Sequence, residues 1–357
     1  MSLTKFRNLN PGINKQKGGP GAGPNDTLSF RKLAVREGHG VSGRSAAGAR
    51  PNRNGHNRKA LYDHACNYLS QVMDVAKKGK EFALAPGFRI LKEMAAIDHP
   101  RDELFIMAIH RDERFKYVIH HSVNVAIYSL AMAEDLGFSK QNKLEVAMAA
   151  LLHDVGMALI PESILYKQDE LSKHEINILR ERPNFSYKIL RSFGDEYAYL
   201  AESAAQVYER VDGSGYPRGM AGDEIHEYAQ IIGLLDMYEA LIHSRPQREK
   251  LTHFTAVKEI IIACKNRFQR NHLKSLLSIF TAFPIYSFVR LNSNAIGKVI
   301  ETYPEQPLRP KLQILYDSQK RKVLTERIVA LPDNPLLNIV DSVPVNEIRE
   351  LSKSQPM

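Results

Sequence analysis

The sequence predicts a mainly α-helical protein that ends in a small all-β module. Apolar residues recur every three to four positions through most of the chain from Lys59 to Phe280, which is the spacing of amphipathic helices. Beyond Phe283-Pro284 the pattern changes to short strands separated by Asn-, Pro- and Ser-containing turns. The first 58 residues show neither pattern. We therefore expect the folded part to begin at residue 59.

Residues 1–58 are expected to form a disordered basic tail. They contain 11 lysines and arginines but only Asp26 and Glu37, and 10 of the 21 glycines of the chain. The whole net charge of +9 therefore comes from this segment. A solvated leader is one interpretation, and loose contact with nucleic acid or anionic lipid is the other. The chain shows no structured aromatic platform that would indicate specific nucleic-acid recognition.

Cysteine content and hydropathy indicate the compartment. The two cysteines, Cys66 and Cys264, are too few and too far apart to form a disulfide framework or a paired thiolate metal motif. No apolar run approaches the roughly 18 residues that cross a bilayer, and the N-terminus lacks the apolar stretch of a secretory signal. These features predict a cytoplasmic protein without a transmembrane segment.

Residues 59–112 are expected to form a small helical segment in front of the main domain. A helix carries Leu61, Tyr68 and Val72 on one face, and later helices are expected over residues 88–97 and 102–110. Pro86-Gly87 marks a break between them. This segment shows no catalytic spacing and suits a dimerisation bundle. A homodimer or a signalling protein as partner is left open.

Residues 113–282 contain polar side chains in unusually apolar surroundings. The helix that begins near Phe115 carries His121 on its apolar face, and His153-Asp154 lie inside another apolar helical segment. Asp236 occupies a third apolar helix. An ionised carboxylate buried without a partner costs several kcal/mol, so a cation or a dense set of hydrogen bonds must neutralise each acid.

Two imidazoles and two carboxylates are a donor set for one divalent metal ion. His121, His153, Asp154 and Asp236 offer mixed nitrogen and oxygen ligands that suit Fe, Mn, Mg, Ni or Zn. A single His on an apolar face is more often a hydrogen-bonded core residue. The combination with His153 and Asp154 favours a ligand role for His121. His120, rotated by about 100 degrees around the same helix, should face elsewhere.

These four ligand candidates, in this order, resemble the ligand set of the HD superfamily of metal-dependent phosphohydrolases. Asp212-Gly213-Ser214-Gly215-Tyr216-Pro217 and Ser244-Arg245-Pro246-Gln247-Arg248 narrow the resemblance to the HD-GYP subfamily, over roughly residues 115 to 255. The resemblance implies an HD-type helical bundle and hydrolysis of the bacterial messenger cyclic di-GMP. It also assigns Arg245 and Arg248 to the phosphates of the messenger. Tyr216, in the GYP loop, is either a substrate contact or a packing residue.

The chain departs from the HD-GYP pattern at further metal ligands. Arg182-Pro183 stands where the family has His-Pro, Val207-Tyr208-Glu209 where it has His-His-Glu, and Met157 where it has Lys. Family members bind two or three metals, and the four matched residues correspond to the first site only. A guanidinium at residue 182 would repel a second cation and is expected to pair with Asp154.

Two functions follow from this pattern. The first is a phosphodiesterase with one metal ion and reduced activity, acting on cyclic di-GMP or a simpler phosphoester, in which Asp154 helps to hold the attacking hydroxide and Arg245 holds phosphate. The second is a catalytically inactive cyclic di-GMP sensor or protein-interaction module, which the residues at 182, 207 and 208 favour.

Residues 283–345 are expected to form the β module, and residues 346–357 a C-terminal tail. A phrase similar to Phe283–Val299 often follows the catalytic domain of HD-GYP proteins. The expected strands cover residues 286–291, 296–302, 311–316, 323–329 and 336–340.

Overall fold

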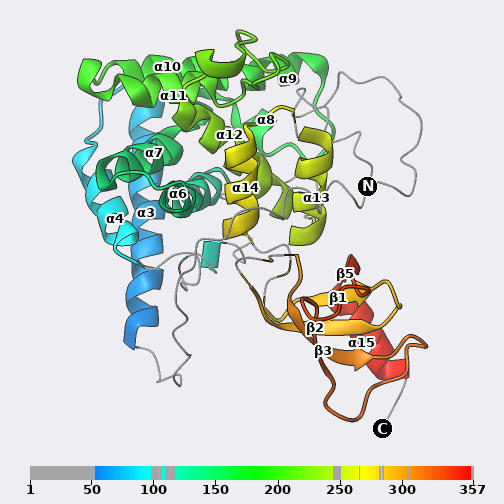
Figure 1. Cartoon of the computed structure of the whole chain (residues 1–357). Helices are drawn as coiled ribbons and strands as arrows, with labels where there is room; N and C mark the ends of the chain where they lie inside the picture. The colour runs from blue at the N-terminus through cyan, green and yellow to red at the C-terminus, as the bar shows by residue number, and fades with distance from the viewer. Residues whose placement is uncertain are drawn as a thin grey trace. The chain divides into compact units, whose positions relative to one another are not determined.

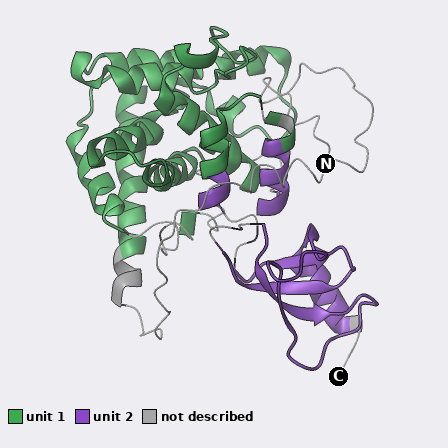
Figure 2. Cartoon of the chain, in the orientation of Figure 1, with its two compact units in different colours: residues 1–17, 47–250, 262–275 green, residues 18–46, 251–261, 276–357 purple. Residues whose placement is uncertain are grey.

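The structure is a computed structural model in which the chain forms two compact units (Figure 2). It describes residues 53–97, 104, 107–108, 117–243, 251–264, 266–280, 283, 285–303, 306 and 308–354. Of these, the first unit contains residues up to 243 together with 262–275, and the second contains 251–261 and the residues from 276 onward. The boundary passes twice through helical segments close to residues 261 and 275.

The regular elements described in the first unit are helices (Figure 1). Its described helices are α3 (Arg53–Lys77), α4 (Ala85–Ala95), α6 (Tyr117–Asp135), α7 (Lys140–Leu152), η2 (Val155–Leu159), α8 (Glu162–Leu165), α9 (Lys173–Arg180), α10 (Arg182–Arg191), η3 (Asp195–Tyr197), α11 (Ala198–Gln206), η4 (Gly222–Glu224) and α12 (Glu227–Ile242). Helices α13 (His253–Cys264) and α14 (Arg270–Ile279) cross the boundary between the units.

Local signals set several helix ends. Gly137, two residues after the end of α6, adopts a φ of +76°, a conformation that favours glycine and ends the helix. Ser139 caps α7 by accepting a hydrogen bond from the backbone N–H of Asn142. Ser172 and Glu175 form a reciprocal capping box at the start of α9.

Helices α6 and α12 are buried on nearly all sides. All residues of α12 from Tyr228 to Ile242 are buried, and α6 is buried almost continuously from Val118 to Ala133. A helix in this position has no solvated face for polar side chains. His121, Asn124, Asp236 and Glu239 must therefore find their partners inside the protein.

The helix boundaries in the N-terminal segment differ from the predicted ones. Helix α3 begins at Arg53, ahead of the expected start at residue 59. Pro86 does not break a helix but lies in the first turn of α4, where its missing N–H costs no hydrogen bond. Most of the helix predicted over residues 102–110 lies outside the described residues.

The second unit contains a five-stranded antiparallel sheet. Its strands are β1 (Phe288–Leu291), β2 (Ile296–Glu301), β3 (Lys311–Tyr316), β4 (Ile328–Ala330) and β5 (Ile339–Val343), in the order β4-β3-β2-β1-β5. Alternate residues such as Val289, Leu312 and Ile314 point into one apolar core. The predicted all-β module is confirmed, although β4 and β5 begin later than expected.

The prediction of a C-terminal tail from residue 346 is wrong for most of its length. Val345–Ser354 form helix α15. Ile348 and Leu351 of α15 pack against a small cluster formed by Ile296, Tyr316 and Val343. An apolar pair three residues apart on one helix face explains this docking, and the segment was too short for its periodicity to stand out.

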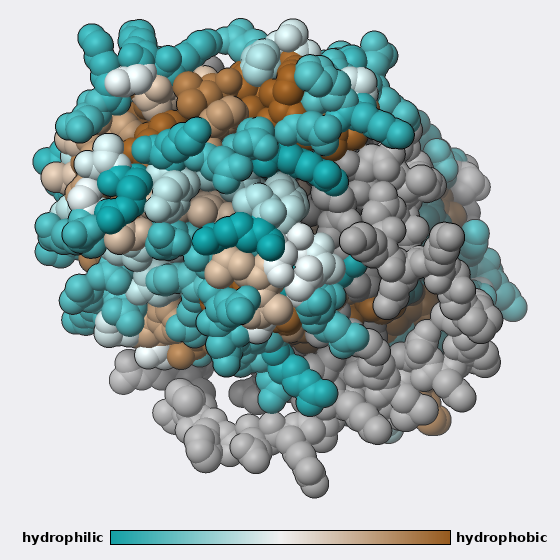
Figure 3. All heavy atoms as spheres, turned by 90° about the horizontal axis from the view of Figure 1, so that it is seen from above, coloured by the Kyte–Doolittle hydropathy of each residue, from teal (hydrophilic) through white to brown (hydrophobic). Residues whose placement is uncertain are grey.

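The surface is largely polar where the structure describes it. Hydrophilic residues cover much of the coloured part of the face in Figure 3, and hydrophobic residues appear in smaller patches between them. Within the described ranges, every helix is too short or too polar to span a bilayer.

Candidate metal centre

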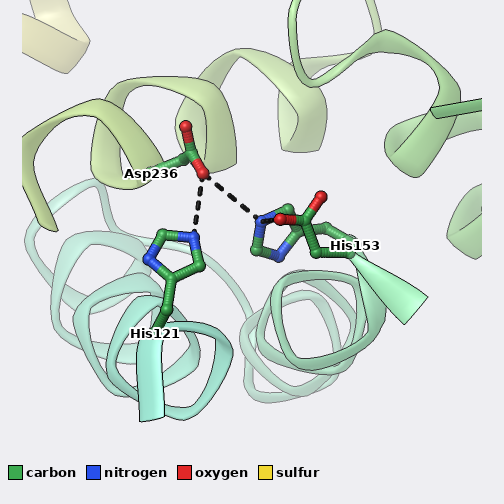
Figure 4. A group of neighbouring side chains, drawn as sticks. His121, His153 and Asp236 are labelled. Atoms are coloured by element: carbon green, nitrogen blue, oxygen red, sulfur yellow. Dashed lines mark hydrogen bonds and ion pairs between the residues drawn. The ribbon is translucent and has the colours of Figure 1, made fainter. Parts of the chain in front are cut away.

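Four buried side chains from three parts of the first unit meet at one point. His121 comes from α6, His153 and Asp154 follow α7, and Asp236 comes from α12. One ligand atom from each residue lies within 4.8 Å of all the others. Figure 4 shows His121, His153 and Asp236 pointing toward one another. The structure thus brings together all four residues that the sequence predicted as metal ligands.

The distances between these atoms match those expected around a single ion. Asp236 Oδ1 lies 2.9 Å from His121 Nε2 and 3.5 Å from His153 Nε2. His153 Nε2 lies 3.8 Å from Asp154 Oδ2. Ligand atoms about 2.1 Å from a shared ion lie roughly 3.4 Å apart in a tetrahedron.

His153 presents a lone pair to this point. Its Nδ1 lies 2.7 Å from the carbonyl oxygen of Ala150 and donates its hydrogen there. Nε2 of the neutral ring is then an acceptor, and it is buried without a hydrogen-bond donor among the described residues. A buried acceptor without a donor, close to two carboxylates, has the surroundings of a metal ligand.

The prediction that His153-Asp154 lie within a helix is wrong in detail. Helix α7 ends at Leu152, His153 is its C-cap residue, and Asp154 precedes η2. The last carbonyls of a helix lack intrahelical partners, and the His153 side chain satisfies that of Ala150. The helix end therefore fixes the orientation of the ring.

Glu239 is a functional residue that sequence reasoning missed. Its Oε2 accepts a short hydrogen bond from His121 Nδ1, so the lone pair of the neutral His121 ring lies on Nε2, toward Asp236. A carboxylate behind a metal-binding His is a common arrangement that fixes the tautomer of the ring. Glu239 follows Asp236 by three positions on a buried helix, and that spacing places both acids on one face.

The charges of this cluster favour a cation. Burial raises the pKa of Asp236, but the hydrogen bond from His121 and the proximity of His153 hold it well below its ordinary value. Burial likewise raises the pKa of Glu239, and His121 and His243 outweigh this effect and lower it. Both acids are therefore ionised in the interior. His121, His153, Asp154 and Asp236 suit a divalent ion in charge, donor type and spacing.

On the other side of Asp154 the structure contains a tyrosine and an arginine. Asp154 Oδ1 accepts a hydrogen bond of 3.0 Å from the Tyr208 hydroxyl, and Arg182 Nε lies 3.6 Å from the same oxygen. The Arg182 guanidinium lies 4.1 Å from the centroid of the Tyr208 ring. The expected pairing of Arg182 with Asp154 is thus present, and only Asp154 Oδ2 faces the imidazoles.

Glu209 does not replace a missing metal ligand. Its carboxylate accepts hydrogen bonds from the backbone N–H groups of Arg218 at 2.7 Å and of Met220 at 3.1 Å. It therefore holds the loop that follows Tyr216-Pro217. Val207, two residues earlier, is fully buried and has no ligand atom in its side chain.

Of the three residues predicted to contact substrate, the structure describes only one. Tyr216 is half-buried, and its ring stacks on that of Tyr208 with the centroids 5.2 Å apart. Tyr216 therefore packs on Tyr208, the residue that donates a hydrogen bond to Asp154. This position agrees with the packing role. Arg245 and Arg248 lie outside the described residues.

Ion binding at this centre is expected to weaken as the pH falls. Burial lowers the pKa of His121, but the charge of Glu239 and the hydrogen bonds to Asp236 and Glu239 raise it to about 9. An ion must displace this proton, so below that pKa the apparent affinity is expected to fall by about tenfold per pH unit. Mn²⁺ titrations from about pH 8 to about pH 6 measure the slope. An affinity independent of pH would contradict a ligand role for His121.

Comparison with known families identifies two domains. Residues 105–271 match the family described as HD domain, and residues 288–351 match the family described as KOW domain associated with HD domain. The first match contains all four residues of the candidate centre. The second coincides with the five-stranded sheet and α15.

Curated relatives share the first domain. The chain is 28% identical over 204 residues to the cyclic di-GMP phosphodiesterase PdeB of Borreliella burgdorferi, covering 57% of this chain and 54% of the relative. A cyclic di-GMP phosphodiesterase of Pseudomonas aeruginosa is 24% identical, with coverage of 72% and 62%. The cyclic di-GMP phosphodiesterase response regulator RpfG of Xanthomonas campestris is 32% identical, with coverage of 52% and 50%. The chain thus spans between half and two thirds of these relatives.

A solved structure has a similar fold. An HDG"Y"P protein from Bdellovibrio bacteriovorus superimposes with a TM-score of 0.52 and 15% sequence identity, covering 70% of this chain and 76% of that chain. At this identity the likeness concerns the fold alone.

Proposed function

Because the chain belongs to the HD-GYP family, we propose that it is a phosphodiesterase that opens cyclic di-GMP or a related cyclic dinucleotide with one divalent metal ion. One observation supports this most directly. His121, His153, Asp154 and Asp236 present one ligand atom each within 4.8 Å of one another. Fe, Mn, Mg, Ni and Zn all accept this donor set.

The balance of charge supports one ion rather than two. Asp154, Asp236 and Glu239 are buried carboxylates, and Arg182 is a buried cation at ion-pair distance from Asp154. One divalent ion together with Arg182 offsets these three negative charges, whereas a second ion would leave an excess of positive charge in the interior.

The side chains around the ion define what this site does to a phosphodiester. When bound, a divalent ion polarises a phosphoryl oxygen and lowers the pKa of water. Asp154 has Oδ2 directed toward the imidazoles, and there it would orient the attacking water. Arg182 supplies a fixed positive charge beside Asp154, where a phosphate oxygen would gain from it. Arg245 and Arg248 are proposed to bind the phosphates of the messenger, and Tyr216 to shape the pocket.

A metal count paired with a turnover assay tests this function. We expect purified protein loaded with Mn²⁺ or Fe²⁺ to hold about one ion per chain, since four ligands surround one point. Incubation with cyclic di-GMP should release the linear dinucleotide slowly, because one ion provides only part of a two-ion mechanism. Elemental analysis and chromatography of the products measure the two quantities. Two or more tightly held ions would contradict the proposed single site.

A sensor that binds without turnover is the second candidate function. The observation in its favour is that Asp154 Oδ1 accepts a hydrogen bond from Tyr208 and lies 3.6 Å from Arg182 Nε. Both contacts would compete with a second ion for this oxygen. Binding of cyclic di-GMP without release of the linear dinucleotide would support the sensor function. In that case Arg245→Ala should weaken binding, and Arg309→Ala, in the second unit, serves as the control.

A further inference from the structure

A continuous chain of hydrogen bonds leads from helix α3 to the candidate metal centre. The Tyr62 hydroxyl on α3 donates to Asn124 Oδ1 at 2.8 Å. Asn124 Nδ2 on α6 donates to Glu239 Oε1 at 3.1 Å, and Glu239 Oε2 accepts from His121 Nδ1. Three links therefore join Tyr62 to a side chain that faces the ion.

Every member of this chain is buried. The exposed fractions are 0% for Tyr62, 1% for Asn124, 3% for Glu239 and 4% for His121. Water cannot readily replace a lost partner at such positions, and an unsatisfied buried polar group costs about 1–3 kcal/mol. Each link thus constrains the next one.

The chain also fixes the direction of each hydrogen bond. Asn124 accepts from Tyr62 through its carbonyl oxygen, which leaves its amide nitrogen directed at Glu239. Glu239 is an acceptor only, and it takes the hydrogen of His121 Nδ1. When the ring is neutral, as ion binding requires, the lone pair of His121 is thereby held on Nε2, 2.9 Å from Asp236 Oδ1. The Tyr62 hydroxyl therefore fixes the orientation of the Asn124 side-chain amide.

A second contact joins Tyr62 to the same helix. The Tyr62 ring stacks on the His120 ring with an interplanar angle of 10°, and its hydroxyl lies 3.3 Å from His120 Nδ1. His120 was predicted to face away from His121, and it lies against α3. A displacement of α3 along α6 would therefore disturb the Tyr62 hydroxyl and with it the orientation of Asn124.

We propose that Tyr62 is a positioning residue of the metal centre, through which helix α3 sets the affinity for the ion. The inference rests on the proposed function only in requiring that His121 bind a divalent ion. Tyr62 does not contact the ion or a substrate. Its contribution is to hold Asn124 and Glu239 so that His121 meets the ion in the correct tautomer and orientation.

Tyr62→Phe tests the inference with Mn²⁺ alone as the probe. The substitution keeps the ring and removes only the hydroxyl that donates to Asn124. Loss of a direct partner of a metal ligand costs about 10–100-fold in affinity, so we expect this more remote change to weaken Mn²⁺ binding by about 3–10-fold. Competition against a chelating indicator with the full chain measures the affinity without reference to turnover.

Tyr68→Phe is the matched control on the same helix. The Tyr68 hydroxyl donates to the carbonyl oxygen of Ala83 at 3.0 Å, and its ring is also buried. Both variants remove one buried hydroxyl from α3 and are expected to lower thermal stability to a similar extent. Only Tyr62→Phe is expected to change the Mn²⁺ affinity.

A double mutant separates positioning from general destabilisation. Glu239→Gln interrupts the chain between Asn124 and His121, so Tyr62→Phe should have no further effect on Mn²⁺ affinity in that background. Equal affinities of the wild-type chain and Tyr62→Phe would overturn the inference and leave the proposed function intact. A wild-type chain that binds no Mn²⁺ would overturn both. Additive effects of the two substitutions on the Mn²⁺ affinity would show that Tyr62 does not act through Glu239.

Discussion

Asp236→Asn is expected to abolish ion binding while leaving the fold in place. The amide has the shape of the carboxylate but no negative charge, and Asp236 Oδ1 lies within 3.5 Å of the Nε2 atoms of both imidazoles. Loss even of an indirect partner of a metal ligand costs about 10–100-fold in affinity, so loss of this ligand should exceed about 100-fold. We expect the ion content to fall from about one per chain to none, with loss of any phosphodiesterase activity.

The control for this variant is an acid outside the centre. Asp223 is exposed in η4, and Asp223→Asn should retain the full ion content. His153→Ala, which removes the buried Nε2 acceptor that faces the ion, should reproduce the loss. Elemental analysis measures the ion, and circular dichroism verifies the helical content. An Asp236→Asn protein that keeps its ion would place the ion elsewhere.

Gly156→Ala is expected to lower the free energy of unfolding by about 3 kcal/mol. A Cβ at this position would lie 2.4 Å from the backbone oxygen of Arg182 and 2.5 Å from the backbone nitrogen of Ser186. Backbone atoms cannot move aside as the end of a flexible side chain does, so α10 must shift away from η2. The Gly156 N–H also donates to Ser186 Oγ at 2.9 Å, and this hydrogen bond would be lost.

Gly79→Ala provides the comparison for Gly156→Ala. Gly79 has a φ of +65°, and a Cβ added there would meet no heavy atom of the described residues within 4 Å, so its cost is backbone strain alone. That strain is about 1–2 kcal/mol. Denaturant unfolding of both variants separates the clash from the strain. A Gly156→Ala protein as stable as the wild-type chain would show that α10 does not pack tightly against η2.

The sequence was sufficient for the parts of the fold that depend on local pattern. A change in periodicity near Phe283-Pro284 indicated the all-β module, and both family matches agree with that division. The boundaries were less certain because caps and tertiary contacts set them. Pro86 entered the first turn of α4 instead of ending a helix, and α15 formed where a tail was expected.

The sequence by itself determined which residues can meet at the centre. Imidazole and carboxylate groups at 121, 153, 154 and 236 occupy apolar helical surroundings, and burial of such groups requires a partner. Periodicity gives the direction in which a side chain points from its helix, and this was enough to place His121, His153 and Asp236 inward and His120 away from them.

Only the tertiary structure decided how the centre is held. Glu239 and Tyr62 lie on other helices than His121, and the hydrogen bonds that Asn124 makes to both depend on how α3, α6 and α12 pack. The ion pair of Arg182 with Asp154 depends likewise on the close approach of α10 at Gly156. Hydrogen bonds require positions within a few tenths of an ångström, and the periodicity of a single chain carries no distances between helices.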